Sequence, residues 1–257
     1  MVKILNAENL KVKIYETGEL LGKSAAEEVI LRIKELLKQK RHVNMLFAAA
    51  PSQNEFLFHL TRKRELEWER INAFHMDEYL ELPEKDERRF GNFLKSTLFD
   101  HIPFASVNYI DGNAVDPGDE CRRYGLLLKE NPLDIACMGI GENGHLAFND
   151  PPVADFSDPY DVKVVRLDER CRQQQVNDGC FKNIDEVPGK AITLTIPSLM
   201  RAGFIYCVVP GERKSEAVFN TIHAPISEQT PSTILRTHSH AVLYIDSGSA
   251  GKLNRAD

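Results

Sequence analysis

The chain has 257 residues, of which 42% are hydrophobic and 27% are charged, and its formal net charge is −6. This composition is typical of a globular protein with a sizeable core, and the acidic balance gives no reason to expect nucleic acid or an anionic membrane as a partner. No apolar stretch approaches the roughly 20 residues of a membrane span, and the five cysteines form no C-x-x-C pair, so we expect a cytoplasmic protein with reduced thiols and no metal site.

Strand-like apolar runs alternate with helix-like segments along most of the chain. The expected strands cover residues 10–16, 43–50, 71–76, 107–112, 133–141, 161–167, 191–196, 204–211 and 241–246. The expected helices, which show apolar spacings of three and four, cover residues 19–40, 54–64, 88–101, 119–129, 169–181 and 212–223. This alternation predicts an α/β fold, a Rossmann-like parallel sheet with helices on both faces. Since no break in composition marks a linker, residues 1–257 are expected to form a single domain.

The ends of the expected strands are where a ligand is expected, because open parallel sheets bind ligands beyond the carboxyl ends of their strands. Asp77 follows the strand 71–76 and has apolar and aromatic neighbours in sequence. Desolvation there can raise the pKa of a carboxylate, which suits a general base. The structural alternative is an aspartate that only caps a helix or forms a turn.

The segment MGIGENGHLAFNDP, residues 138–151, has the Gly-x-Gly-x-x-Gly spacing of a dinucleotide-binding loop at Gly139, Gly141 and Gly144. Such a loop needs a helix of about three turns that starts at the second or third glycine. Here two prolines follow too soon for that helix, and the loop lies in the middle of the chain rather than in its first strand-helix unit. We therefore expect no dinucleotide cofactor at this loop.

The same loop presents His145 together with Asn143, Asn149 and Asp150. Histidine is the side chain best suited to move protons near neutral pH, and the carboxylate five residues further on can orient the ring. A structural turn with a hydrogen-bonded histidine is the alternative.

Two further strand ends carry candidate anion ligands. Ser52 and Gln53 follow the strand 43–50, and we expect Ser52 to cap a helix whose free amides, including those of Gln53 and Asn54, can bind an anion. Plain capping is the alternative. Lys214 follows the strand 204–211 and can meet a phosphate as a point charge.

Together these motifs resemble the family of glucosamine-6-phosphate deaminases and galactosamine-6-phosphate isomerases, which is related to the 6-phosphogluconolactonases. FHMDEYLELP is similar to the family segment that holds the general base, and MGIGENGHLAFNDP is similar to its histidine loop. VPGERKSEAV resembles the family's lysine segment, and TPSTILRTH resembles a segment near its C-terminus. The order and spacing of these motifs hold from about residue 12 to residue 246.

The resemblance implies an aldose-to-ketose isomerisation of a small sugar phosphate that, in the deaminases, releases ammonia without a metal or organic cofactor. It implies that His145 assists ring opening and that Asp77 moves a proton from C2 to C1. Asp150 would pair with His145, and Asn143 stands where many members carry aspartate. Assembly into a homo-oligomer and allosteric control stay open.

The phosphate-binding positions depart from the family pattern. The loop after the strand 43–50 contains no glycine, and side chains restrict how closely a backbone can wrap a phosphate. A family arginine falls on Gln175, with Arg172 nearby as its expected substitute, and Gly141 and Gly144 complete the expected substrate-binding set. Two alternatives therefore stand beside the deaminase reading: a related isomerase or lactonase that acts on another or a non-phosphorylated sugar, and a non-catalytic sugar-binding regulator.

Overall fold

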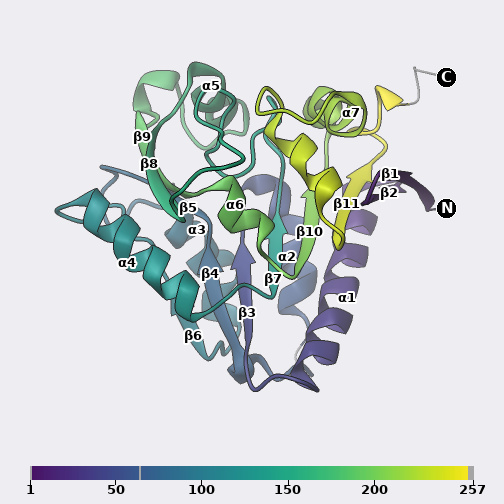
Figure 1. The fold of residues 1–257 in the computed structure, drawn as a ribbon, viewed down its shortest axis with the longest axis horizontal. Helices are drawn as coiled ribbons and strands as arrows, with labels where there is room; N and C mark the ends of the chain where they lie inside the picture. Colours follow the sequence, from purple (N-terminus) through teal and green to yellow (C-terminus); the bar gives the residue numbers. More distant parts are fainter. Residues whose placement is uncertain (1, 64, 254–257) are drawn as a thin grey trace.

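The computed structural model describes residues 2–63 and 65–253, and its largest unit is an eight-stranded sheet (Figure 1). The sheet has the order β1-β2-β11-β10-β7-β3-β4-β6. Its strands are β1 (Lys3–Ala7), β2 (Leu10–Tyr15), β3 (Val43–Phe47), β4 (Ile71–His75), β6 (Ser106–Asn108), β7 (Ile135–Met138), β10 (Phe204–Val209) and β11 (Ala241–Asp246). All pairings in this sheet are parallel except the antiparallel pair β1–β2. The predicted α/β class is confirmed.

Helices cover both faces of the large sheet (Figure 1). One face packs against α1 (Gly18–Leu37), α2 (Asn54–Thr61) and α3 (Phe90–Thr97), and the other against α4 (Pro117–Glu130), α6 (Ile196–Met200) and α7 (Ser215–His223). Side chains of a strand alternate between the faces, so in β3 Met45 and Phe47 pack in the first core and Leu46 in the second. Burial on both sides explains why β10 (FIYCVV) is continuously apolar and why β3 (VNMLF) is apolar at every position but one.

A second, smaller sheet corrects one part of the prediction. β5 (Asp77–Tyr79), β8 (Val162–Arg166) and β9 (Lys190–Leu194) form an antiparallel sheet in the order β5-β9-β8. Segments 161–167 and 191–196 are strands as expected, but the expectation that they join the parallel sheet is wrong. The helix α5 (Glu169–Asn177) lies between them in sequence, and an intervening helix permits a parallel crossover without requiring one.

Several element boundaries also differ from the prediction. β1 was not expected, and the expected helix 88–101 is α3 followed by a 3-10 turn at Phe99–His101. The helix expected over 54–64 ends at Thr61, and Arg64 lies outside the described residues. The helix expected over 212–223 begins as a 3-10 turn, Glu212–Lys214, before α7.

The order of the strands reverses between β3 and β7, the topological switch point of the sheet. From there β3, β4 and β6 follow one another to one side, while β7, β10 and β11 follow one another to the other side. In open α/β sheets the ligand crevice lies outside the carboxyl ends of the strands at such a point. The fold therefore brings the loops after β3, β4, β7 and β10 to one edge.

Among the helices that the structure describes, none is both long enough and apolar enough to span a membrane.

Candidate active site

A cavity of about 60 Å³ opens at the carboxyl edge of the large sheet. The predicted residues that the structure brings together on its wall are Ser52, Gln53, Asp77, Gly141, His145 and Lys214. Sequence reasoning missed Gln174 as a wall residue and treated Gln175 only as a lost arginine; both reach the cavity from α5. The aromatic side chains of Phe90 and Phe148 complete an apolar part of the wall.

Asp77 lies where the chain passes from the large sheet to the small one. It is the first residue of β5, and Met76 alone separates it from the end of β4. Only 6% of its surface is exposed. Burial raises the pKa of Asp77 well above its ordinary value, and repulsion from Glu78 raises it further. A carboxyl group with a raised pKa can take a proton and also return it, which is the property expected of a general base.

Glu78 points away from this chemistry and has a structural role. Its carboxylate accepts hydrogen bonds from the backbone amides of Tyr79, Phe90 and Gly91, and it lies 3.7 Å from the guanidinium of Arg89. Burial nevertheless raises the pKa of Glu78, against the opposing effect of these partners. The carboxylate thereby ties β5 to the start of α3, and its neighbour Asp77 is the one that lines the cavity.

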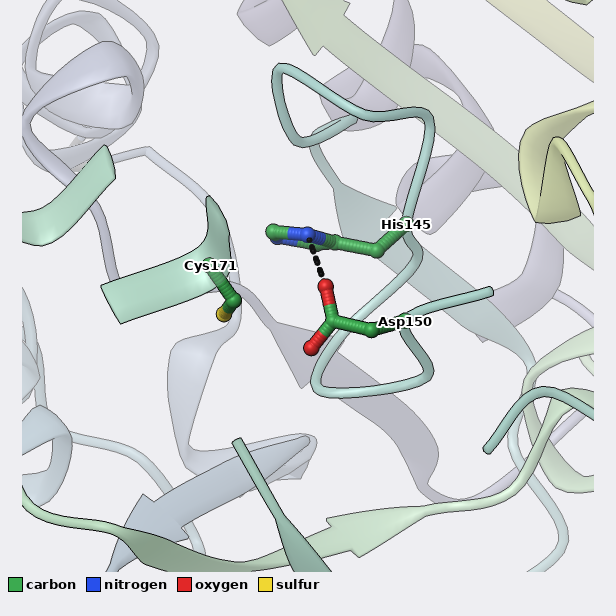
Figure 2. Close-up of side chains that lie close together, drawn as sticks. All are labelled: His145, Asp150 and Cys171. Carbon is green, nitrogen blue, oxygen red and sulfur yellow. Dashed lines mark ion pairs between the residues drawn. The ribbon is translucent and has the colours of Figure 1, made fainter. Parts of the chain in front are cut away.

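His145 and Asp150 form a buried pair (Figure 2). Nδ1 of His145 lies 2.8 Å from Oδ1 of Asp150, and the Asn143 carboxamide donates to the same oxygen at 2.9 Å. Burial raises the pKa of Asp150, but the charge of His145 and the hydrogen bond from Asn143 outweigh it, so the pKa lies below its ordinary value. The His145–Asp150 contact has an ion-pair distance but not the alignment of a hydrogen bond, so the Asp150 carboxylate acts on the ring through its charge, which favours the protonated imidazole. Asn143 does not line the cavity; it acts from behind the pair.

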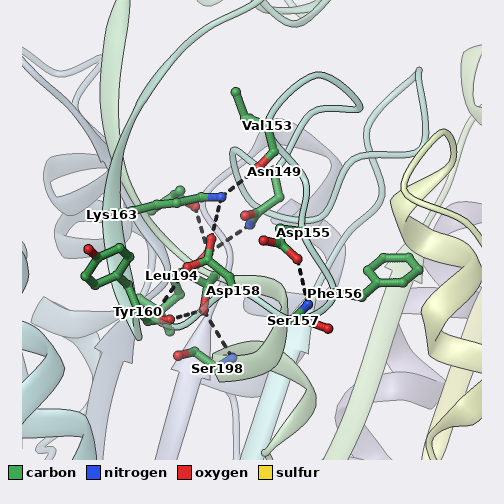
Figure 3. A network of polar contacts seen from close by, with 12 residues as sticks. Asn149, Val153, Asp155, Phe156, Ser157, Asp158, Tyr160, Lys163, Leu194 and Ser198 are labelled. Atoms are coloured by element: carbon green, nitrogen blue, oxygen red, sulfur yellow. Dashed lines mark hydrogen bonds and ion pairs between the residues drawn. The ribbon is translucent and has the colours of Figure 1, made fainter.

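The loop that follows Asp150 is tied down on its far side (Figure 3). The Asn149 carboxamide donates to the carbonyl of Leu194 at 2.8 Å, which joins the loop to β9. The Lys163 ammonium donates to the Val153 carbonyl at 2.6 Å and pairs with Asp158 at 2.8 Å. Because Val153 in turn donates its amide to the carbonyl of Asp150, these contacts fix the backbone that carries the Asp150 carboxylate.

Two glycines, Gly141 and Gly144, determine the shape of the loop that carries His145. A Cβ on Gly141 would lie 2.2 Å from Cε1 of His145, so only glycine leaves room for the ring. Gly144 has φ +87°, a conformation that L side chains rarely adopt, and it is not part of the cavity wall. The expectation that Gly144 contacts substrate is therefore not supported. No helix occurs in the described chain between β7 and β8, as expected from the two prolines that follow the glycines.

The loop after β3 departs from the anion site expected there. Ala50, not Ser52, occupies the N-cap position, and residues 51–53 form a 3-10 turn. Within that turn the amide of Gln53 donates to Ala50 and that of Asn54 to Pro51, so the expectation that these two amides bind an anion is wrong. Ser52 and Gln53 line the cavity, although the Gln53 carboxamide is also held by the carbonyl of Val208 at 3.0 Å.

Lys214 is the buried cation of the cavity wall. Only 7% of its surface is exposed, and no described residue forms a hydrogen bond or ion pair with its ammonium. Burial lowers the pKa of Lys214, and the nearby carboxylates Asp178 and Glu142 partly oppose this. A buried ammonium group that faces a cavity without a bonded partner favours an anionic ligand.

Arg172 does not take the role expected for it. Its guanidinium donates to the backbone carbonyls of Ile184, at 2.6 Å, and Val187, at 3.0 Å, and it is not part of the cavity wall. On α5 the residues that reach the cavity are Gln174 and Gln175. The expectation that Arg172 binds phosphate is therefore wrong, because this arginine lies on the side of the helix that ties α5 to the chain before β9.

One group of side chains has the composition of a metal site. The ligand atoms of His145, Asp150 and Cys171 lie within 4.8 Å of one another (Figure 2). Burial raises the pKa of the Cys171 thiol well above its ordinary value, as do the carboxylates near it, and a metal ligand must be the thiolate. Because the imidazole and the carboxylate also form an ion pair with each other, the donor chemistry fits a proton-transfer pair beside a protonated thiol better than a metal centre.

The fold and the cavity together define a class: an α/β protein with a small-ligand site at its switch point, which combines a buried carboxylate, a His–Asp pair and a buried lysine. The chain belongs to the family of glucosamine-6-phosphate isomerases and 6-phosphogluconolactonases, whose family model matches residues 16–244. The resemblance drawn from the sequence motifs is thereby confirmed.

Individual relatives agree with this assignment. The chain is 35% identical over 237 residues to a glucosamine-6-phosphate deaminase of Bacillus cereus (strain B4264), with 92% of this chain and 87% of the relative covered. Among solved structures, a monomeric glucosamine-6-phosphate deaminase superposes with a TM-score of 0.86 at 31% identity, covering 93% of this chain and 98% of that one. The 6-phosphogluconolactonase of Thermotoga maritima shares the fold, with a TM-score of 0.75 at 17% identity over 91% of this chain and 98% of that one.

Proposed function

We propose that the protein is an amino-sugar-6-phosphate deaminase that converts glucosamine-6-phosphate, or its galactosamine isomer, to the ketose phosphate and ammonia. The family assignment and the deaminase relatives support this reading. The observation that carries it is the arrangement of Asp77 and His145 on one cavity wall, with the Asp150 carboxylate 2.8 Å from the His145 ring. The lactonase alternative is not favoured, because the lactonase named above is only 17% identical to this chain.

In the proposed reaction His145 begins the chemistry. Its Nε2 takes the proton of the C1 hydroxyl and delivers it to the ring oxygen as the bond between C1 and that oxygen breaks, which gives the open-chain aldehyde and leaves the imidazole as it began. The Asp150 carboxylate, 2.8 Å from Nδ1, stabilises the charged ring when it forms. His145 is suited to this role because its ring lines the cavity while its pair with Asp150 lies behind it.

Asp77 then carries the isomerisation. Its carboxylate takes the proton from C2, which leaves the enolate form of an enolamine. The carboxyl group then returns that proton to C1 while the amino nitrogen passes one of its protons to the C1 oxygen. The resulting imine at C2 reacts with water to give the ketose and ammonia, so one water is consumed for each ammonia released. The substrate's own carbonyl and amino group make the C2 proton removable, and we propose that no metal or organic cofactor takes part.

The phosphate end of the substrate is proposed to lie against Lys214. The ammonium supplies the charge, while the Ser52 hydroxyl and the Gln175 carboxamide supply neutral hydrogen bonds from the same wall. The Gln53 carboxamide instead donates to Ser52 Oγ and to the Val208 carbonyl, which holds the Ser52 side chain in place. This set binds an anion with one cation, where the family pattern expects an additional arginine.

The test is a panel of 6-phosphorylated and free amino sugars, with ammonia and ketose measured separately, and with a sugar lactone as comparison. A deaminase releases ammonia and ketose in equal amounts from a phosphorylated amino sugar. Hydrolysis of the lactone without ammonia release from any amino sugar would contradict the proposal, and so would binding without turnover.

A further inference from the structure

A histidine that the proposed mechanism does not use lies directly behind Asp77. His75 is the last residue of β4, is 0% exposed and does not line the cavity. Its ring packs edge-on against the rings of Tyr109 and Tyr124. The Tyr124 hydroxyl accepts the amide N–H of His75 at 3.1 Å and donates to its carbonyl at 2.9 Å. The backbone of His75 is thereby fixed from the α4 side of the sheet.

The hydrogen bonds of the His75 ring determine its tautomer. Nε2 lies 2.9 Å from the backbone nitrogen of Ile110, and since an amide N–H only donates, Nε2 is the acceptor and carries no proton. Nδ1 therefore carries the proton and donates to the carbonyl of Asp77 at 2.9 Å. Burial lowers the pKa of His75 to about 4, although the hydrogen bond to Asp77 opposes this. The ring is therefore neutral at physiological pH.

Asp77 is consequently held on both sides of its Cα. The carbonyl of Met76, on one side, accepts the amide N–H of Leu194 from β9 at 2.9 Å. The carbonyl of Asp77, on the other side, accepts the proton of His75 Nδ1. The two peptide units that orient the carboxylate are thus fixed by the small sheet and by the end of β4, at the point where the chain crosses between the sheets.

We propose that His75 is a positioning residue whose Nδ1–H bond to the Asp77 carbonyl holds the Asp77 carboxylate in line with the carbon that it deprotonates. This inference rests on the proposed role of Asp77 as the base. A displacement of about 1 Å at a reacting group can cost about 100-fold in rate. Loss of this bond should therefore reduce kcat while substrate affinity is maintained by the rest of the cavity wall.

Two substitutions distinguish the role of Nδ1 from the role of Nε2. The carboxamide of asparagine reaches about the place of Nδ1, and that of glutamine about the place of Nε2. His75→Asn keeps a donor for the Asp77 carbonyl and loses the acceptor for Ile110, whereas His75→Gln does the reverse. Both variants lose the ring packing, so both should unfold at a lower temperature than the wild type. Only His75→Gln should lower kcat strongly, by about 10- to 100-fold, with KM changed by less than about twofold.

His238 offers a matched control. Its ring also bridges two backbone groups: Nδ1 accepts the amide of His240 at 3.1 Å, and Nε2 donates to the carbonyl of Ala202 at 2.9 Å. It is half-buried in the turn before β11 and is not part of the cavity wall. The same two substitutions at His238 should lower the unfolding temperature and leave kcat unchanged.

The test compares the kcat of each variant with its unfolding temperature. Equal kcat in His75→Asn and His75→Gln, or wild-type kcat in His75→Gln, would overturn the positioning role. If neither variant folds, ¹⁵N NMR of the wild-type ring decides: a proton on Nδ1 supports the role, and a proton on Nε2 overturns it. Loss of activity in Asp77→Asn with normal activity in His75→Gln would leave the proposed function intact and remove only this inference.

Discussion

His145 Nδ1 lies 2.8 Å from Oδ1 of Asp150, and Asn143 donates to that same oxygen. Because the two side chains act as one unit, removal of either should cost about the same. We expect His145→Gln and Asp150→Asn each to lower kcat by about 100-fold, and the double variant to be little worse than either single one. Steady-state kinetics of the three variants measures this. Losses that add in the double variant would show that the two residues act independently.

Asp77 should destabilise the fold at neutral pH. Its pKa in the folded protein lies well above the ordinary value of 3.8 because of burial, so the folded state binds the proton more tightly than the unfolded state does. The free energy of unfolding contributed by this group therefore falls as pH rises above about 4. Asparagine does not titrate, so the Asp77→Asn variant should have a larger free energy of unfolding than the wild type at pH 7. The difference in free energy of unfolding should be smaller near pH 4.

Denaturant unfolding at several pH values measures this effect. Asp119→Asn on α4 is the control, because Asp119 is exposed and its ion pair with Arg122 is a surface pair. The control should show little pH-dependent difference from the wild type. If the advantage of Asp77→Asn instead grew as pH fell, the sign of the pKa shift would be wrong.

Lys214 should determine the preference for a phosphorylated substrate. Lys214→Ala is expected to raise KM for a 6-phosphorylated amino sugar by about 10-fold or more, since a charge-assisted bond contributes about 1.5–3 kcal/mol. It should leave a free amino sugar unaffected. Arg213→Ala is the matched control, because Arg213 is exposed and its guanidinium bonds the carbonyl of Asn177. If Lys214→Ala altered neither substrate, the phosphate assignment would fail while the roles of Asp77 and His145 could stand.

Gly141 should be intolerant of a side chain. A Cβ there would overlap the His145 ring at 2.2 Å, so Gly141→Ala should move the ring and lower kcat by about 100-fold. Gly189→Ala is the control, since nothing lies within 4 Å of a Cβ at that position. Comparable activity in the two variants would mean that the ring can move without loss of function.

The strand-end rule predicted the site because parallel strands end at one edge of a sheet. It placed Asp77, His145 and Lys214 on one wall, although they come from three different strand ends. It did not predict that Asp77 begins a strand of a second sheet, because the antiparallel pairing of β5 with β9 depends on a segment more than a hundred residues away. Apolar patterning reports which segments are strands and does not report their partners.

Side-chain hydrogen bonds were the least predictable feature. Arg172 and Gln175 both belong to α5, and only the structure shows that the arginine bonds two backbone carbonyls while the glutamine reaches the cavity. The 3-10 turn after β3 likewise uses the amides of Gln53 and Asn54 internally. Capping preference is a local property, whereas the choice between helix forms at Pro51 depends on how the turn packs against β10.

The central claim is that Asp77 transfers a proton between C2 and C1 of an amino sugar phosphate. The most direct measurement is turnover of glucosamine-6-phosphate in ²H₂O, with ammonia assayed and deuterium at C1 of the ketose followed by NMR, for the wild type and Asp77→Asn. We predict that the wild type releases ammonia and introduces deuterium at C1, and that Asp77→Asn does both at least about 100-fold more slowly while still binding the substrate. Ammonia release at the wild-type rate by Asp77→Asn would contradict the account.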